Sequence, residues 1–111
     1  MTSPWGLEPV SKNMVLSAAA DFVQQIKIQH PITKEPYEPP SGSTVYFLLG
    51  EKPYTRWDGV LSGASALFKI DAQEAELIES GSVQRFYIAQ PDGEKLRPYC
   101  LTVGRVTRRG Q

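Results

Sequence analysis

The sequence predicts an all-β fold, a small antiparallel β-sandwich of the immunoglobulin-like or partly open barrel type, with one short helix at about residues 71–80. Three observations predict it. Apolar and polar residues alternate along several short segments, which is the period of half-buried strands. Nine prolines and nine glycines divide the 111 residues into short pieces, which suits strands and turns. The length fits one domain with a modest core.

Residues 1–20 are expected to form an N-terminal arm. Prolines and a glycine interrupt regular structure there, yet Trp5, Leu7 and Val10, which lie among them, are large and apolar. Disordered tails are usually poor in such residues. We therefore expect the arm to pack, either on its own domain or on a neighbouring subunit.

The sandwich domain is expected over residues 21–104. Its first strand begins after Asp21, where Phe22, Ile26 and Ile28 share one face of an alternating pattern. The strand TVYFLL at 44–49 is apolar, β-branched and aromatic throughout. This composition predicts a central strand that is buried on both faces.

The stretch WDGVLSGASALFKI at 57–70 predicts a hairpin. A strand over residues 55–61 would bury Trp57 and Leu61, and Ser62-Gly63 would form the turn. The returning strand would then place three residues on the core side, Ala66, Phe68 and Ile70.

The short helix follows this hairpin. Asp71 is a good N-cap residue, and Glu74 stands three positions later, as in a capping box. Leu77 and Ile78 supply an apolar face, and Gly81 is a suitable stop.

The last third of the chain predicts a second hairpin. Apolar residues alternate over 84–89, Pro-Asp-Gly at 91–93 favours a turn, and a return strand covers about 95–103. Gly104 breaks the pattern, so residues 105–111 are expected to be a basic C-terminal tail.

The composition argues against several classes of function. Lysine plus arginine equals aspartate plus glutamate, so the basic excess of a nucleic-acid binder is missing. The lone Cys100 can form neither an intrachain disulfide nor a cysteine-based zinc site. His30 and Cys100 do not stand in a nucleophile–base pattern, so we expect no enzyme, no metal site and no cofactor. The single cysteine makes the cytosol the expected place of assembly. No apolar run is long enough to span a membrane, and residues 1–13 do not resemble a signal peptide.

Charged residues of opposite sign are grouped in two segments. The helical segment carries Glu74, Glu76 and Glu79, and the C-terminal segment carries Arg105, Arg108 and Arg109. Each group could simply be solvated. Alternatively, the acidic group of one subunit could receive the arginines of the next, which suits a head-to-tail ring.

A carbohydrate-binding module is a second hypothesis. Aromatic residues can form a flat platform on which sugar rings stack, and exposed Tyr37, Tyr54 and Trp57 could do so here.

Several spacings together resemble a known family. The order is LSAAADF, an alternating strand, a Pro-rich loop, STVYFLL, W-x-G-x-x-S-G-A-x-A-x-F-x-I, a capped helix, GSVQRFYI, a turn, and a last strand ending in VGRVTR. This pattern covers residues 16–108 and resembles a family of small β-sandwich proteins in the tails of long-tailed bacteriophages. The family includes collar proteins that anchor lateral tail fibres and minor tail proteins, and it is more loosely similar to the N-terminal domains of upper-baseplate proteins.

The resemblance implies a virion structural protein of the tail, assembled in the host cytoplasm. It would form a homo-oligomer, expected to be a ring, and would connect the tail to fibres or other tail-tip proteins without membrane or direct nucleic-acid contact. The expected partner interface consists of Trp5, Leu7 and Val10, the three glutamates and the three arginines. A capsid decoration or head–tail joining protein is the alternative with the same assembly logic.

Overall fold

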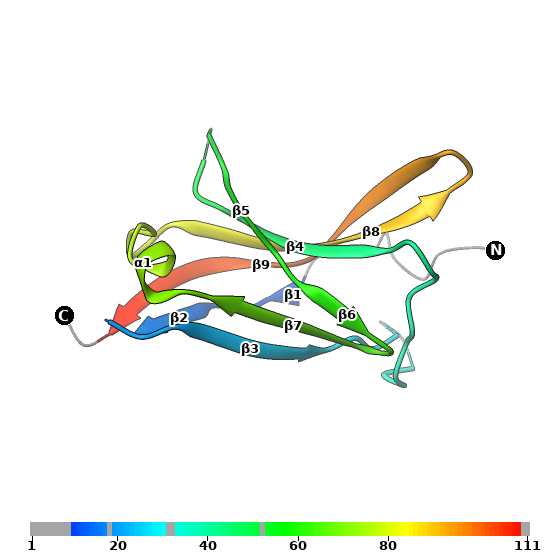
Figure 1. The fold of residues 1–111 in the computed structure, drawn as a ribbon, viewed down its shortest axis with the longest axis horizontal. Coiled ribbons are helices and arrows are strands. Elements are labelled where there is room, and N and C mark those ends of the chain that lie inside the picture. The colour runs from blue at the N-terminus through cyan, green and yellow to red at the C-terminus, as the bar shows by residue number, and fades with distance from the viewer. Residues whose placement is uncertain (1–9, 18, 31–32, 52, 110–111) are drawn as a thin grey trace.

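In the part of the chain that the structure describes, two β-sheets face each other, with one helix at one end (Figure 1). The computed structural model describes residues 10–17, 19–30, 33–51 and 53–109. The larger sheet has the order β1 (Val10–Ser11), β9 (Lys95–Arg109), β8 (Val83–Asp92), β4 (Thr44–Leu49) and β5 (Thr55–Asp58), and β2 (Met14–Ser17) also pairs with β9. The smaller sheet has the order β3 (Phe22–Lys27), β7 (Ser65–Ile70) and β6 (Val60–Ser62). The predicted β-sandwich is therefore confirmed.

Aromatic side chains from both sheets build the centre of the core. Phe68 of β7 is fully buried, and its ring centroid lies 4.7 Å from that of Phe47 and 5.9 Å from that of Phe86. Phe22 packs against Phe47 and Trp57 at 6.5 and 5.6 Å. Such offset and edge-to-face pairs add to the stability that burial provides. The two sheets are thus joined by one aromatic cluster.

The strand predictions based on period two are confirmed. β4 lies between β5 and β8, and Val45, Tyr46 and Phe47 are all buried, so the strand is covered on both faces. In β7 the buried residues are Ala66, Phe68 and Ile70, as the alternation predicts.

The single strand predicted over 55–61 is two strands in two different sheets. β5 pairs with β4, whereas β6 pairs with β7, and the chain crosses between the sheets at Gly59. A Cβ atom at position 59 would lie 2.7 Å from the Phe68 ring, so a glycine is required where the chain passes over the core. The Gly59 N–H still donates to Val45 O at 3.0 Å. The alternation continues through the crossing and therefore does not reveal it.

The helix α1 (Ala72–Ala75) is shorter than the predicted 71–80. Asp71 is at the N-cap position but makes no side-chain capping bond, and the Ala72 N–H donates instead to Asp21 Oδ1 at 2.8 Å. Leu77, predicted to belong to the apolar face, is 78% exposed, whereas Ile78 is buried. So short a helix gains its stability from packing rather than from its own hydrogen bonds.

The β8–β9 hairpin projects beyond the other strands (Figure 1), and its turn lies at Gly93 and Glu94, between the paired residues Asp92 and Lys95. Gly93 has φ of 67°, which a side chain would strain. The return strand was predicted to stop at Val103. Instead, β9 continues to Arg109.

Gly104 lies inside β9 because another backbone segment passes over it. A Cβ atom at this position would collide with Lys12 O, so glycine here permits close approach and does not end the strand. Gln84 Nε2 donates to the same Lys12 oxygen. The Lys12 N–H donates to Val103 O at 3.0 Å.

Both chain ends belong to the larger sheet where they are described. β1 and β2 pair in parallel with β9, so the sheet is mixed and not antiparallel throughout. Met14 and Leu16 are buried in the core. Residues 14–17 of the expected arm thus pair with residues 106–109 of the expected tail, because each supplies the backbone hydrogen bonds that the other needs. No helix in the described ranges is long and apolar enough to cross a membrane.

Candidate partner interface

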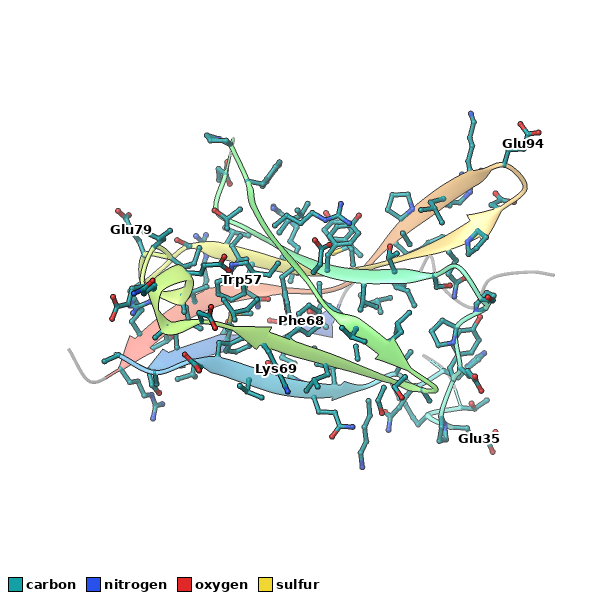
Figure 2. All side chains as sticks on the ribbon, in the orientation of Figure 1. Glu35, Trp57, Phe68, Lys69, Glu79 and Glu94 are labelled. Atoms are coloured by element: carbon teal, nitrogen blue, oxygen red, sulfur yellow. The ribbon has the colours of Figure 1, made fainter. Side chains whose placement is uncertain are left out.

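The acidic group lies on the surface at one end of the molecule. Glu74 is in α1, Glu76 and Glu79 follow it, and all three side chains are exposed. Figure 2 shows Glu79 pointing outward beside α1. Ion pairs in the described part of the chain are Arg56–Asp58 and Arg97–Asp92, so the three glutamates make none there. Exposed Leu77 lies among them.

Two of the three predicted arginines hold the chain's own backbone. Arg108 Nη1 donates to Ala75 O at 2.7 Å and to Ile78 O at 3.1 Å, where α1 ends. Arg105 Nη1 donates to Gly81 O at 3.0 Å. These guanidinium groups add charge-assisted hydrogen bonds to carbonyl oxygens at the end of α1 and in the turn that follows it. These arginines therefore approach the acidic segment of their own chain.

Replacing Arg108 with alanine is expected to lower the free energy of unfolding by about 1.5–3 kcal/mol, because two charge-assisted hydrogen bonds are lost. Arg109→Ala is the control, since the Arg109 side chain is exposed and its loss should change stability by about 0.5 kcal/mol or less. Urea denaturation of both variants measures this. Equal effects would show that the Arg108 bonds do not stabilise the fold.

The other predicted interface residues are only partly placed. Val10 pairs with Thr102 in the ladder between β1 and β9. Trp5 and Leu7 lie outside the described residues.

A stack of tyrosine and arginine side chains covers the outer face of the larger sheet. Tyr46 and Tyr87 lie opposite each other on β4 and β8, with ring centroids 5.4 Å apart and planes 7° from parallel. The Arg56 guanidinium carbon lies 3.9 Å from the Tyr46 ring centroid, and Arg56 Nε donates to Asp58 Oδ1 at 2.8 Å. Tyr46 is only 9% exposed as a result. This stack was not predicted, although tyrosines on the outward-facing positions of two strands were a usable signal in the sequence.

Cys100 lies opposite Tyr87, on β9. Its Sγ donates to Thr102 O at 3.3 Å. Burial raises the pKa of the Cys100 thiol, and Arg85 only partly opposes that rise. Burial also raises the pKa of Tyr87, and the neighbouring Cys100 raises it further. A thiol with a raised pKa holds little thiolate at neutral pH and is a poor nucleophile.

Because burial raises the pKa of Cys100 and of Tyr87, the free energy of unfolding is expected to decrease above about pH 9. In the unfolded chain Cys100 and Tyr87 ionise near 9.0 and 10.0, whereas folding raises both values. Above those values the unfolded state holds fewer of these protons than the folded state, so the free energy of unfolding falls as pH rises. Urea denaturation between pH 7.5 and pH 10.5 should show a shallower fall for Cys100→Ser than for the unchanged chain. Identical slopes would exclude the thiol as a contributor.

The other groups considered for catalysis are dispersed. His30 Nδ1 accepts a hydrogen bond from the Thr33 N–H at 3.3 Å in the loop after β3. Cys100 is on β9, within the stack beside Tyr87. Within the described residues, no three side chains of histidine, cysteine, aspartate or glutamate gather as metal ligands.

The hypothesis of a sugar-stacking platform requires Tyr37, Tyr54 and Trp57 to be exposed, and for Trp57 this prediction is wrong. Trp57 is 3% exposed and packs on Phe22 in the core. A ring buried in this way offers no face to a ligand.

A groove runs between the edges of the two sheets, along β2 and β3. The groove has a volume of about 430 Å³ and is lined by residues from Asn13 to Ser17 and from Asp21 to Gln24. A second hollow of about 300 Å³ follows beside the end of β3, where Lys12, Lys27 and Lys34 line it. Met14 and Phe22 are the buried residues along the first part. This groove was not predicted, because no pattern within a single strand indicates which sheet edges stay open.

Comparisons with known proteins agree with the fold. A family model described as an LtfC-like β-sandwich domain matches residues 8–109. Among solved structures, the chain is similar to the N-terminal domain of phage TP901-1 ORF48, with a TM-score of 0.59 and 14% sequence identity over 93% of this chain and 91% of that chain. At this identity the likeness shows a shared fold. The comparison with curated proteins gives no match.

Proposed function

The chain belongs to the LtfC-like family of phage tail β-sandwich domains, and from this premise we propose that it is a virion structural protein that joins the tail to fibres or to other tail-tip proteins. The observation that carries the proposal is the family match over residues 8–109, nearly the whole chain. The families that match are structural and not enzymatic. We propose that the mechanism is adhesion.

Assembly around a tail requires contacts between copies or with other virion proteins. The acidic group is suited to such a contact, because Glu74, Glu76 and Glu79 are exposed around the exposed Leu77. An apolar side chain surrounded by charges is a common arrangement of a small contact, in which the charges set orientation and partner choice. Basic residues of a neighbour, among them Arg109, would face it. We propose a homo-oligomeric ring built from this contact and from the N-terminal segment that holds Trp5 and Leu7.

The proposed location is tested by immunogold labelling of intact particles that contain the protein. Label at the tail, at the collar or the tip, is the expected result. Label on the head would favour the capsid decoration or head–tail joining role and would overturn the proposal.

The proposed contact is tested by light scattering of the purified protein at rising salt concentration. Replacing Glu74, Glu76 and Glu79 with glutamine should weaken assembly and reduce its dependence on salt. Glu35 and Glu94 are matched controls, because both are exposed and lie at the opposite end of the molecule (Figure 2). Equal assembly of all variants would remove the acidic group from the interface.

A further inference from the structure

The groove between β2 and β3 has two open strand edges as its sides. In the described chain, β2 pairs with β9 and β3 pairs with β7, and neither has a strand on its other side. Residues of both strands line the same hollow, and the two strands run along one border of the molecule (Figure 1). An open edge presents unpaired N–H and C=O groups, so it is a template for a further strand.

The direction of the free backbone groups on β3 follows from its pairing with β7. The Ile28 N–H donates to Ala64 O at 2.7 Å. In antiparallel pairing, alternate residues direct their N–H and C=O groups to the same side. Even-numbered residues of β3 therefore face β7, and the backbone groups of Val23, Gln25 and Lys27 face the groove.

One extended segment of about four residues would satisfy both edges. β2 itself is four residues long, so it limits the length over which a strand could pair on both sides. Adding a strand to an open edge is a recurrent mode of recognition, in which the backbone supplies affinity and alternate side chains supply specificity. A side chain directed inward would meet the apolar residues Met14 and Phe22.

We propose that the occupant of this groove is residues 5–8 of a second copy of the chain, donated as a short strand. The sequence there is Trp-Gly-Leu-Glu, with Pro4 and Pro9 on either side. Prolines lack the N–H that a ladder needs, so they limit the pairing segment to four residues, the length of β2. Trp5 and Leu7 are two positions apart and would point to the same side of a strand, toward the core. This inference rests on the proposed assembly of copies and names the place where they join.

The direction of the first strands makes a second copy the donor. β1 and β2 both run parallel to β9, opposite Thr102–Val103 and Val106–Arg109 in turn. The chain therefore enters the sheet at Val10 from the end of β1 that is farther from β2. Residues 5–8 of the same chain would have to reverse direction to reach the groove, whereas those of a neighbour would not.

Charge supports the same occupant. The hollow lined by Lys12, Lys27 and Lys34 lies next along the chain, before Asn13 and after Gln24. The four-residue segment ends with Glu8. A donated strand that places Trp5 and Leu7 over Met14 would bring the Glu8 carboxylate toward these lysines.

Disulfide trapping between separate chains tests the proposal. In a Cys100→Ser background, one chain carries Glu8→Cys and the other carries Gln25→Cys on β3. The two are mixed, oxidised gently and separated on a non-reducing gel. The control partner carries Val60→Cys, which is 68% exposed on β6, the other edge strand of the same sheet. Strand donation should give the Gln25 product in about tenfold excess over the Val60 product, because binding creates a high effective concentration of the pair.

A second variant identifies the side chains responsible. Replacing Trp5 and Leu7 with alanine in the donor chain should reduce the Gln25 product to the level of the Val60 control. Equal products for the two partners, or a Gln25 product that is insensitive to this double substitution, would overturn strand donation. Tail labelling and light scattering report separately on the proposed function, so a protein that assembles without this crosslink would disprove the strand donation alone.

Discussion

Replacing Phe68 with alanine is expected to lower the free energy of unfolding by about 3–5 kcal/mol. Phe68 is fully buried, and its ring contacts Phe47 and Phe86 of the opposite sheet. The neighbours cannot collapse into the space easily, because Gly59 passes directly over the ring with no side chain to fill it. The loss would be a large part of the total stability of a small domain, which is about 5–15 kcal/mol.

Chemical denaturation followed by tryptophan fluorescence measures this loss, since Trp57 belongs to the same cluster through Phe22. Val60→Ala is the matched control, because Val60 lies on the same small sheet but is 68% exposed. It should change stability by about 0.5 kcal/mol or less. A Phe68→Ala loss as small as that of the control would show that the aromatic cluster does not hold the two sheets together.

Replacing Gly104 with alanine is expected to cost about 3 kcal/mol or more, at the upper end of the range for inserting atoms into a packed site. The new methyl group would collide with Lys12 O, which is backbone and cannot rotate away. The segment between β1 and β2 would have to move off β9, which would disturb the Lys12–Val103 hydrogen bond and the Gln84 contact to the same oxygen.

Amide hydrogen exchange distinguishes this effect from a general loss of stability. Protection should fall first at Lys12 and Arg105, whose N–H groups donate to Val103 O and to Asn13 Oδ1 across the contact that would open. Gly93→Ala is the control: no atom lies within 4 Å of its added Cβ, and its cost should be the backbone strain of about 1–2 kcal/mol at φ 67°. If Gly104→Ala costs less than this control, the close approach at Lys12 is not a constraint on the sequence.

Sequence patterning predicts the individual strands well, because burial of one face imposes a period of two wherever a sheet covers a core. Phe22 and Phe68 are both on their predicted faces. The same patterning cannot report which strand is the neighbour. For this reason one continuous alternation over 55–61 hides a crossing at Gly59, and the parallel pairing of β1 and β2 with β9 has no local signal.

The candidate interface is harder to predict, because surface residues are less constrained than core residues. From the sequence alone, Arg108 is predicted to belong to a solvated basic tail. In the fold, its guanidinium group donates to the carbonyl groups of Ala75 and Ile78. Leu77 is predicted to lie on the apolar face of the helix. It is exposed, because the helix ends two residues before it. The groove depends on which edges remain unpaired, and that follows from the arrangement of the sheets rather than from any single strand.

The pairing of β1 and β2 with β9 also has a kinetic consequence. Val10 lies opposite Thr102 and Met14 opposite Val106, so each of these residues finds its partner far along the chain, among residues that are synthesised much later. Contacts between such distant parts of a chain form slowly, because the entropy of closing a long loop is lost before the contacts contribute any stabilising energy. The larger sheet therefore cannot be completed on the ribosome before residue 109 has emerged, and an unfinished chain cannot present a completed surface to its neighbours.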